Sequence, residues 1–156
     1  MLIKLRERSA EALRGKAAGE AGFTLVELLV VMLILGLLAA IAIPSFFNQR
    51  DKAKDASAKE SVRTAQTAIE TYATDHDGSY ASATAGTPAS DLNKIESTLN
   101  NVGANLTVTS TASTYTVKVT SATGNTFSIS RASDGTLTYP CTTGGTAGCP
   151  SGNAWG

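Results

Sequence analysis

The 156-residue chain has one histidine, two cysteines and no net formal charge, and each of these scarcities excludes a class of function. His76 stands alone, no two acids lie at a catalytic spacing, and neither a phosphate-binding loop nor a nucleophile motif is present. Two cysteines without a histidine near them in sequence do not complete a four-ligand zinc site. We therefore expect neither an enzyme nor a protein that needs a metal or a cofactor.

The charges are divided unequally along the chain. Residues 1–22 carry five Lys or Arg and three Glu, whereas the remainder carries eight basic and ten acidic residues. A mildly acidic main part offers no basic surface for phosphates, so we expect no nucleic-acid binding by a clear motif. A chain of this length accommodates one small domain and one extended element.

A single apolar run dominates the N-terminal third. Residues 28–43 are all apolar, and their flanks extend the run to 25 residues, 23–47. At about 1.5 Å per residue such a helix spans roughly 37 Å, which is enough to cross a bilayer. The basic residues before the run place the N-terminus in the cytoplasm. A secretory signal peptide would be shorter and would end in small residues, so a single-pass anchor is the simpler alternative.

One acidic residue, Glu27, lies four residues into this apolar stretch. A carboxylate inside a bilayer costs on the order of 2.5 to 3.5 kcal/mol, and less near the interface. Such a residue usually has a partner or a function. The alternative is that Glu27 lies at the level of the lipid headgroups and is merely tolerated there.

The segment from residue 22 to 31, GFTLVELLVV, resembles the prepilin cleavage and methylation motif of type IV pilins and of the pseudopilins of type II secretion. Gly22 stands before the cut, Phe23 after it and Glu27 four residues further on, and Pro44 matches the kink position of many such helices. The resemblance implies that a prepilin peptidase cuts between Gly22 and Phe23 and methylates the new amine of Phe23. It also implies that Glu27 faces the amine of a neighbouring subunit during assembly. The 22-residue leader is long for this family.

This resemblance predicts a structural subunit of a type IV pilus-like filament, with a role in adhesion, motility or DNA uptake. Its partners would be itself and other pilins, the peptidase, the membrane and the pilus or secretion machinery. The precursor would lie in the inner (cytoplasmic) membrane, and the assembled filament would be extracellular or periplasmic. A pseudopilin of a type II secretion system is one alternative, and a membrane-tethered binding protein that never polymerises is another.

The residues after the apolar run predict an α+β head of pilin-like layout. Apolar or small side chains recur at helical spacing from Ala58 to Tyr72, so one helix is expected from about Thr24 to Ala73. Four alternating segments then predict a small antiparallel meander packed on the C-terminal half of this helix. The expected strands are 106–110, 115–120, 126–131 and 136–139, and a short helix with Ser90 as N-cap is expected from 88 to 99. The expected inward-facing residues are Leu106, Val108, Tyr115, Val117, Val119, Phe127, Ile129, Leu137 and Tyr139.

The domain organisation follows from these segments. The leader is expected at 1–22, the membrane and polymerisation helix at 23–47 and the exported head at 48–156. Within the head we expect the helix to continue to about 74, a loop and short helix at 75–100, strands within 105–140 and a cysteine loop at 141–149.

Two features of the head keep alternatives open at this stage. Export would make a disulfide between Cys141 and Cys149 the expected state, and two free thiols are the alternative. Residues 75–79, DHDGS, read as a turn that ends the helix, although some secretion pseudopilins bind calcium. The spacing of these acids does not match an EF-hand loop, so a plain turn is favoured.

Overall fold

The computed structural model describes residues 22–156, so the predicted leader lies outside the described residues apart from Gly22. The described chain begins with helix α2 (Leu25–Thr74), close to the predicted bounds. The chain divides into two compact units between Ile43 and Pro44, and each is described here by itself.

The first unit consists of the apolar part of α2. This is the one helix among residues 22–156 that is long and apolar enough to cross a membrane, with a mean hydropathy of 2.9 in its most apolar window. None of that window is buried within the chain. All of its large apolar side chains are exposed, and Leu25, Met32 and Ile41 are 71 to 78% exposed. An exposed apolar surface of this length is unstable in water, so it needs a bilayer or other protein chains around it.

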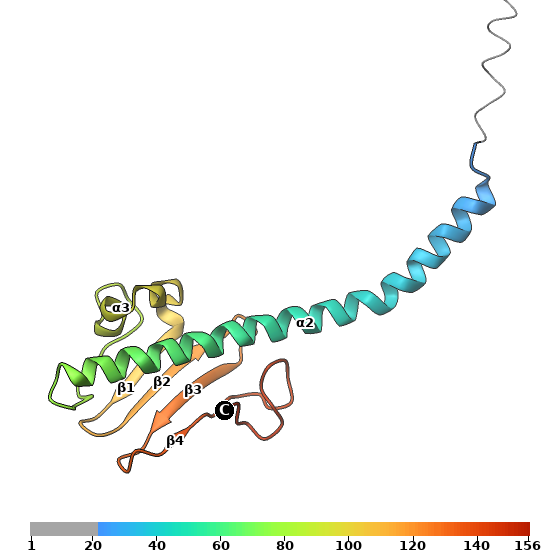
Figure 1. Cartoon of the computed structure of the whole chain (residues 1–156). Helices are drawn as coiled ribbons and strands as arrows, with labels where there is room; N and C mark the ends of the chain where they lie inside the picture. Colours follow the sequence, from blue (N-terminus) through green and yellow to red (C-terminus); the bar gives the residue numbers. More distant parts are fainter. Residues whose placement is uncertain (1–21) are drawn as a thin grey trace, which may run out of the picture. The chain divides into compact units, whose positions relative to one another are not determined.

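The second unit is the head, in which the rest of α2 lies across one face of a four-stranded sheet (Figure 1). The strands are β1 (Leu106–Ser110), β2 (Tyr115–Thr120), β3 (Thr126–Arg131) and β4 (Leu137–Thr138). They pair antiparallel in the order β1-β2-β3-β4, with Val117 opposite both Val108 and Ile129. The α+β architecture expected from the sequence is confirmed.

The core of the head forms where α2 meets the inner face of this sheet. Every member of the predicted helical stripe is buried, and Ala68 and Ala73 add to it, so the buried residues are Ala58, Val62, Ala65, Ala68, Ile69, Tyr72 and Ala73. From the sheet, six of the nine expected inward-facing residues are buried, and the other three pack at the edge of the core. The edge residues are Val108, Leu137 and Tyr139. Alternation along each strand therefore placed the apolar face correctly.

The predicted helix from 88 to 99 is wrong in extent. Helix α3 covers only Asp91–Ile95, and Glu96 leaves helical geometry with φ −129° and ψ 97°. The Glu96 side chain accepts hydrogen bonds from the Thr98 amide and hydroxyl, which starts a separate 3-10 helix, η1 (Ser97–Asn101), followed by η2 (Gly103–Asn105). Local side-chain capping thus outcompeted a longer helix.

The predicted N-cap position of α3 is confirmed, but the capping hydrogen bond comes from another residue. Ser90 occupies the N-cap position, but its side chain makes no capping bond to the helix. Its hydroxyl oxygen instead accepts from the Thr87 amide at 3.2 Å. The Thr84 hydroxyl oxygen accepts from the Asp91 amide at 3.0 Å and supplies the missing contact from the preceding loop.

Residues 75–78 form the turn that ends α2. Asp77 and Gly78 adopt positive φ values of 53° and 82°, and the Gly78 amide donates to the Ala73 carbonyl at 2.8 Å. This left-handed closure is typical of helix C-termini. His76 stacks on the Tyr72 ring at 3.8 Å, and its Nδ1 lies 2.8 Å from the Tyr72 carbonyl oxygen. Within residues 22–156 no group of three or more His, Cys, Asp or Glu side chains is arranged to hold a metal ion.

Candidate functional site

The predicted cleavage site lies immediately before α2. Gly22 and Phe23 are non-helical and exposed, and the Phe23 side chain is 77% exposed. A Cβ added at Gly22 would meet nothing within 4 Å. The fold itself therefore has room for a side chain at Gly22, so a requirement for glycine there would come from an enzyme that approaches the backbone closely.

Thr24 caps the helix that carries Glu27. Its hydroxyl oxygen accepts from the Glu27 amide at 3.1 Å, and its carbonyl accepts from the Leu28 amide at 3.2 Å. The Thr24-x-x-Glu27 spacing is that of a capping box. The sequence analysis did not assign this role to Thr24, although the spacing was a readable signal. With this cap the helix begins at Leu25, two residues after the expected cut, and Glu27 lies in its first turn.

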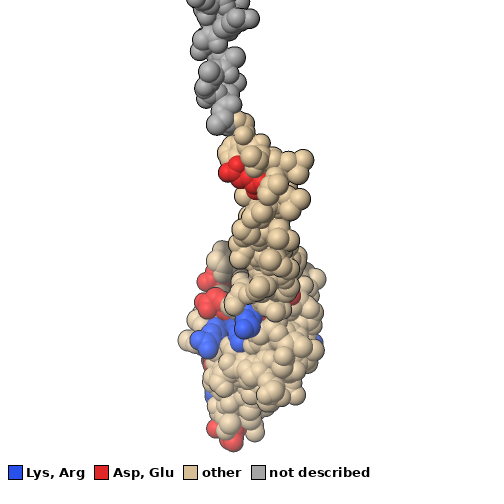
Figure 2. Space-filling view, turned by 90° about the vertical axis from the view of Figure 1, so that its right-hand side faces the viewer, with Lys and Arg blue, Asp and Glu red and all other residues tan. Residues whose placement is uncertain are grey.

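Glu27 is the acid of the first turn of α2, where the helix dipole favours a negative charge. In Figure 2 the apolar segment is tan along its length except for an acidic patch near its start. The Glu27 side chain is exposed among side chains such as Leu28 and Val31, which are 56% and 47% exposed. Phe23, Thr24 and Glu27 thus share the start of one apolar helix. Helix α2 continues through Pro44, and the kink expected there stays a prediction.

A second acid, Asp55, lies in the head and was not singled out as a site from the sequence. It is 0% exposed on the buried face of α2. Its carboxylate accepts from the Thr123 hydroxyl, from Asn125 Nδ2 at 2.8 Å and from the Gly148 amide at 2.9 Å. These donors come from the turn between β2 and β3 and from the cysteine loop. One carboxylate therefore joins three segments that are distant in sequence.

The surroundings of Asp55 decide its protonation. Burial raises the pKa of this carboxyl, but hydrogen bonds from Ser121, Thr123, Asn125 and the Gly148 amide outweigh burial and hold the pKa below its usual value. The group is therefore ionised at neutral pH, compensated by dipoles rather than by a cation.

The signal for a buried Asp55 was present in the sequence. Asp55 precedes Ala58 by three residues and Val62 by seven, so it continues the apolar stripe by one turn. The sequence analysis assigned no role to Asp55. A carboxylate on a buried stripe indicates a ring of donors, but helical periodicity does not reveal which residues supply them.

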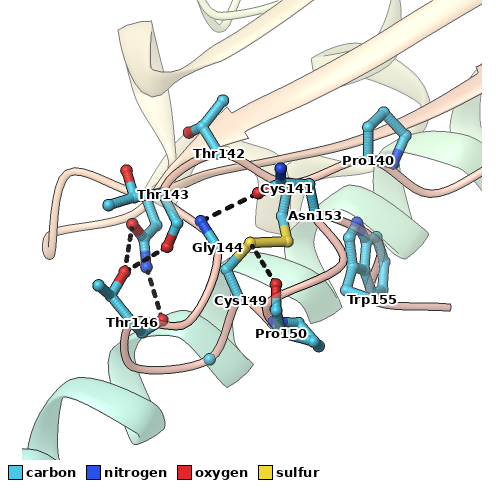
Figure 3. The surroundings of a disulfide bond; sticks show 12 residues. Pro140, Cys141, Thr142, Thr143, Gly144, Thr146, Cys149, Pro150, Asn153 and Trp155 are labelled. Carbon is cyan, nitrogen blue, oxygen red and sulfur yellow. Dashed lines mark hydrogen bonds between the residues drawn. A yellow bond between two sulfur atoms is a disulfide. The ribbon is translucent and has the colours of Figure 1, made fainter.

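The cysteine loop closes over Asp55. Cys141 and Cys149 form a disulfide with Cα atoms 5.9 Å apart, as expected for an exported chain (Figure 3). The loop is held internally by the Gly145 amide, which donates to the Cys149 carbonyl at 2.9 Å. A Cβ at Gly148 would lie 2.5 Å from Asp55 Cβ, so only glycine allows this approach.

The segment after the loop returns to the sheet. The Trp155 amide donates to the Tyr139 carbonyl at 3.0 Å, and its indole Nε1 donates to the Ser128 carbonyl at 3.2 Å. On its other side the ring lies beneath α2, with the Arg63 guanidinium 5.5 Å and Lys59 Nζ 5.8 Å from its centroid. Trp155 therefore fastens the C-terminal segment to both layers of the head.

We expect replacement of both cysteines by serine to destabilise the head by about 2.5 kcal/mol, the loop-closure entropy of a loop this short. The loop also places the Gly148 amide against Asp55, so opening the loop removes one hydrogen bond to the buried carboxylate. Thermal unfolding of the detergent-solubilised chain, followed by the fluorescence of its single tryptophan, measures the loss. Ser151→Ala, an exposed change in the same segment, is the matched control. An unchanged midpoint in the double variant would show that the disulfide does not hold the loop.

Comparison with known proteins identifies a family motif in the N-terminal segment. Residues 18–43 match the family model described as the prokaryotic N-terminal methylation motif. Competence protein ComGC of Halalkalibacterium halodurans is 38% identical over 58 residues, which are 37% of this chain and 57% of that protein. Type II secretion system core protein G of Pseudomonas aeruginosa is 39% identical over 57 residues, 36% of this chain and 40% of that protein. Type IV major pilin protein PilA of Myxococcus xanthus is 41% identical over 56 residues, 36% of this chain and 26% of that protein.

These likenesses cover about a third of this chain and between a quarter and three fifths of each relative. No solved structure matches the chain. Residues 18–43 therefore carry the prokaryotic N-terminal methylation motif, and none of the three relatives matches more than 58 residues of the chain.

Proposed function

We propose that this chain, whose N-terminal segment is of prepilin type, is a structural subunit of a type IV pilus-like filament. A prepilin peptidase would remove residues 1–22 and methylate the amine of Phe23. The mature subunits would then assemble through their apolar helices, with Glu27 of one subunit facing the Phe23 amine of a neighbour. The protein acts by assembly rather than by catalysis.

The observation that carries this proposal is the arrangement at the start of α2. Thr24 caps the helix, Glu27 lies in its first turn, and an exposed apolar surface follows directly. A carboxylate and an ammonium are each costly in an apolar bundle and tolerable together. The pair also sets the axial register, because the rest of residues 23–47 is uncharged. Cleavage creates the amine, so the leader would keep the precursor from assembling.

The proposed organisation follows the sequence segments. Residues 1–22 form the leader, 23–47 the membrane and polymerisation helix, and 48–156 the exported head. The precursor is anchored in the membrane by its apolar helix with the leader in the cytoplasm, and the filament lies outside the cytoplasm. The partners are further copies, other pilins and the pilus or secretion machinery.

A pseudopilin of a type II secretion system is the second candidate, because core protein G of that system is 39% identical to this chain over 57 residues. The two candidates share processing and helix assembly and differ in where the filament goes. Filaments recovered by shearing the cell surface favour the pilus, whereas filaments confined to the periplasm favour the pseudopilin.

We expect the mature protein to begin at Phe23 with a methylated amine, 22 residues shorter than the precursor. Intact-mass and N-terminal peptide mass spectrometry measures both changes. Gly22→Leu should leave the precursor uncut, because a bulky side chain blocks close approach of the peptidase while the fold has room for it. Ala21→Ser is the control and should be processed normally. Recovery of the wild-type protein with Met1 retained, in cells that hold the peptidase, would contradict the proposed function.

A further inference from the structure

The head has a hollow of about 990 Å³ at the end where its part of α2 begins. One wall is α2, through Asn48, Asp51 and Lys52. The other walls are the turn between β2 and β3 and the cysteine loop, which add the polar side chains of Thr123, Asn125, Thr143 and Thr146. The hollow is therefore lined by polar side chains and belongs entirely to the head unit.

The charge of the hollow is set by one lysine. Asp51 is neutralised by Lys54, whose Nζ lies 2.9 Å from its carboxylate. Asp55 lies behind the wall and is already satisfied by its own ring of donors. Lys52 lines the hollow and is exposed, and the neighbouring Arg50 is exposed as well. Figure 2, which faces this end of the head, shows basic side chains there with acidic side chains beside them.

The opposite end of the head carries the opposite charge. Asp75 and Asp77 are exposed in the turn after α2, and the last turn of α2 contains no basic residue. Both acids thus adjoin the negative end of the helix dipole, which is unfavourable unless a cation is supplied from elsewhere. His76 lies between them but is stacked on Tyr72.

A third acid at this end is engaged within its own turn. The Asp134 carboxylate accepts from the Thr136 amide at 2.9 Å. Arg131 lies over the Tyr80 ring, 5.7 Å from its centroid, rather than over the turn at 75–77. The turn at 75–77 is therefore an exposed acidic feature without a basic residue in the last turn of its own helix.

We propose that the hollow receives the Asp75–Asp77 turn of a second copy of this chain, with Lys52 facing its acids. This inference rests on the proposed filament and names the contact between heads within it. The two surfaces lie at opposite ends of one helical segment, separated by about 26 residues or roughly 39 Å along α2. A contact between two different surfaces does not close on itself in a dimer but repeats along an axis. The second copy is therefore displaced by about one head length, and the contact extends with the filament.

The test is a charge swap in the full chain, expressed with its assembly machinery. Lys52→Glu should lower the yield of sheared or periplasmic filaments at least about fivefold, and Asp75→Lys combined with Asp77→Lys should do the same. All three changes together should restore at least about half of the wild-type yield, because the pair is re-formed with reversed signs. Lys118→Glu, an exposed lysine on β2, is the matched control and should assemble normally.

A cysteine pair gives a second readout. Lys52→Cys with Asp77→Cys should form, on mild oxidation of filaments, a ladder of dimers, trimers and longer species. The pair Lys118→Cys with Asp77→Cys should not. Single-variant defects without rescue by the swap, or cross-linked species that stop at dimers, would overturn the proposed contact while leaving the filament intact. Absence of filaments from the wild-type protein would instead overturn the proposed function.

Discussion

Replacing Glu27 with alanine is expected to abolish filament assembly while the protein still inserts into the membrane. In the proposed bundle the alanine leaves the neighbour's Phe23 ammonium without its carboxylate. Removal of one partner from a buried ion pair costs about 3 to 5 kcal/mol, which lowers the association constant at each step by at least about a hundredfold. Filament yield and membrane-fraction content, measured on the same cells, separate assembly from insertion.

Two variants define the cause of this loss. Glu27→Gln keeps the size and the polarity of the side chain and removes only the charge, so it should also fail. Glu60→Ala removes an exposed acid of the head and should assemble normally. Normal filaments from Glu27→Ala would show that the carboxylate does not pair with the amine, and Glu27 would then be an acid tolerated at the headgroup level.

Replacing Asp55 with alanine is expected to destabilise the head by at least about 3 kcal/mol. The change leaves the Thr123 hydroxyl, the Asn125 amide and the Gly148 amide without their shared acceptor in a buried place, at about 1 to 3 kcal/mol per group. For a head of this size the midpoint should fall by about 10 to 15 °C. Tryptophan fluorescence of the detergent-solubilised chain follows this transition, because Trp155 packs against α2, the helix that carries Asp55.

The pH dependence of Asp55→Asn isolates the charge. The folded pKa of Asp55 lies below its unfolded value, so the carboxylate adds stability above the unfolded pKa of about 3.9. That stability is lost as the pH falls through the folded pKa. The difference in unfolding midpoint between the wild type and Asp55→Asn should therefore be constant above about pH 5 and shrink below pH 4. Asp91 and Asp134, whose pKa values are also lowered, are common to both proteins and cancel.

Glu60→Ala, on the same helix, is the control for the unfolding measurement on Asp55→Ala. Glu60 is exposed five residues further along α2, and its replacement by alanine should change the midpoint little. Equal midpoints for the wild type and Asp55→Ala at pH 7 would contradict the structural role assigned to the buried carboxylate.

The elements that depend on local pattern were predictable from the sequence. Helix α2 follows from an unbroken apolar run and a helical stripe that ends at Tyr72, and β1, β2 and β3 follow from alternating residues between turns. The helix predicted from 88 to 99 failed because a single side chain, Glu96, bonds to Thr98 and breaks it at Ile95. A propensity average over ten residues does not register one such competing hydrogen bond.

The start of α2 belongs to what the sequence by itself determined about this protein. The spacing of Gly22, Phe23 and Glu27 within one short segment is what predicts the cleavage, methylation and assembly residues. The apolar run after them predicts a helix that must be covered by lipid or by other chains. Such features act over a few turns of helix, where sequence distance and spatial distance agree.

What only the tertiary structure decided is how the head is held together. Asp55 meets Asn125 and Gly148, which follow it by 70 and 93 residues, and these contacts give a buried, hydrogen-bonded position to an acid to which the sequence analysis assigned no role. The hollow beside Lys52 likewise forms only where α2 meets the turn between β2 and β3 and the cysteine loop. Periodicity identifies the face of a helix that is buried, whereas the partner across that face is set by the packing of distant segments.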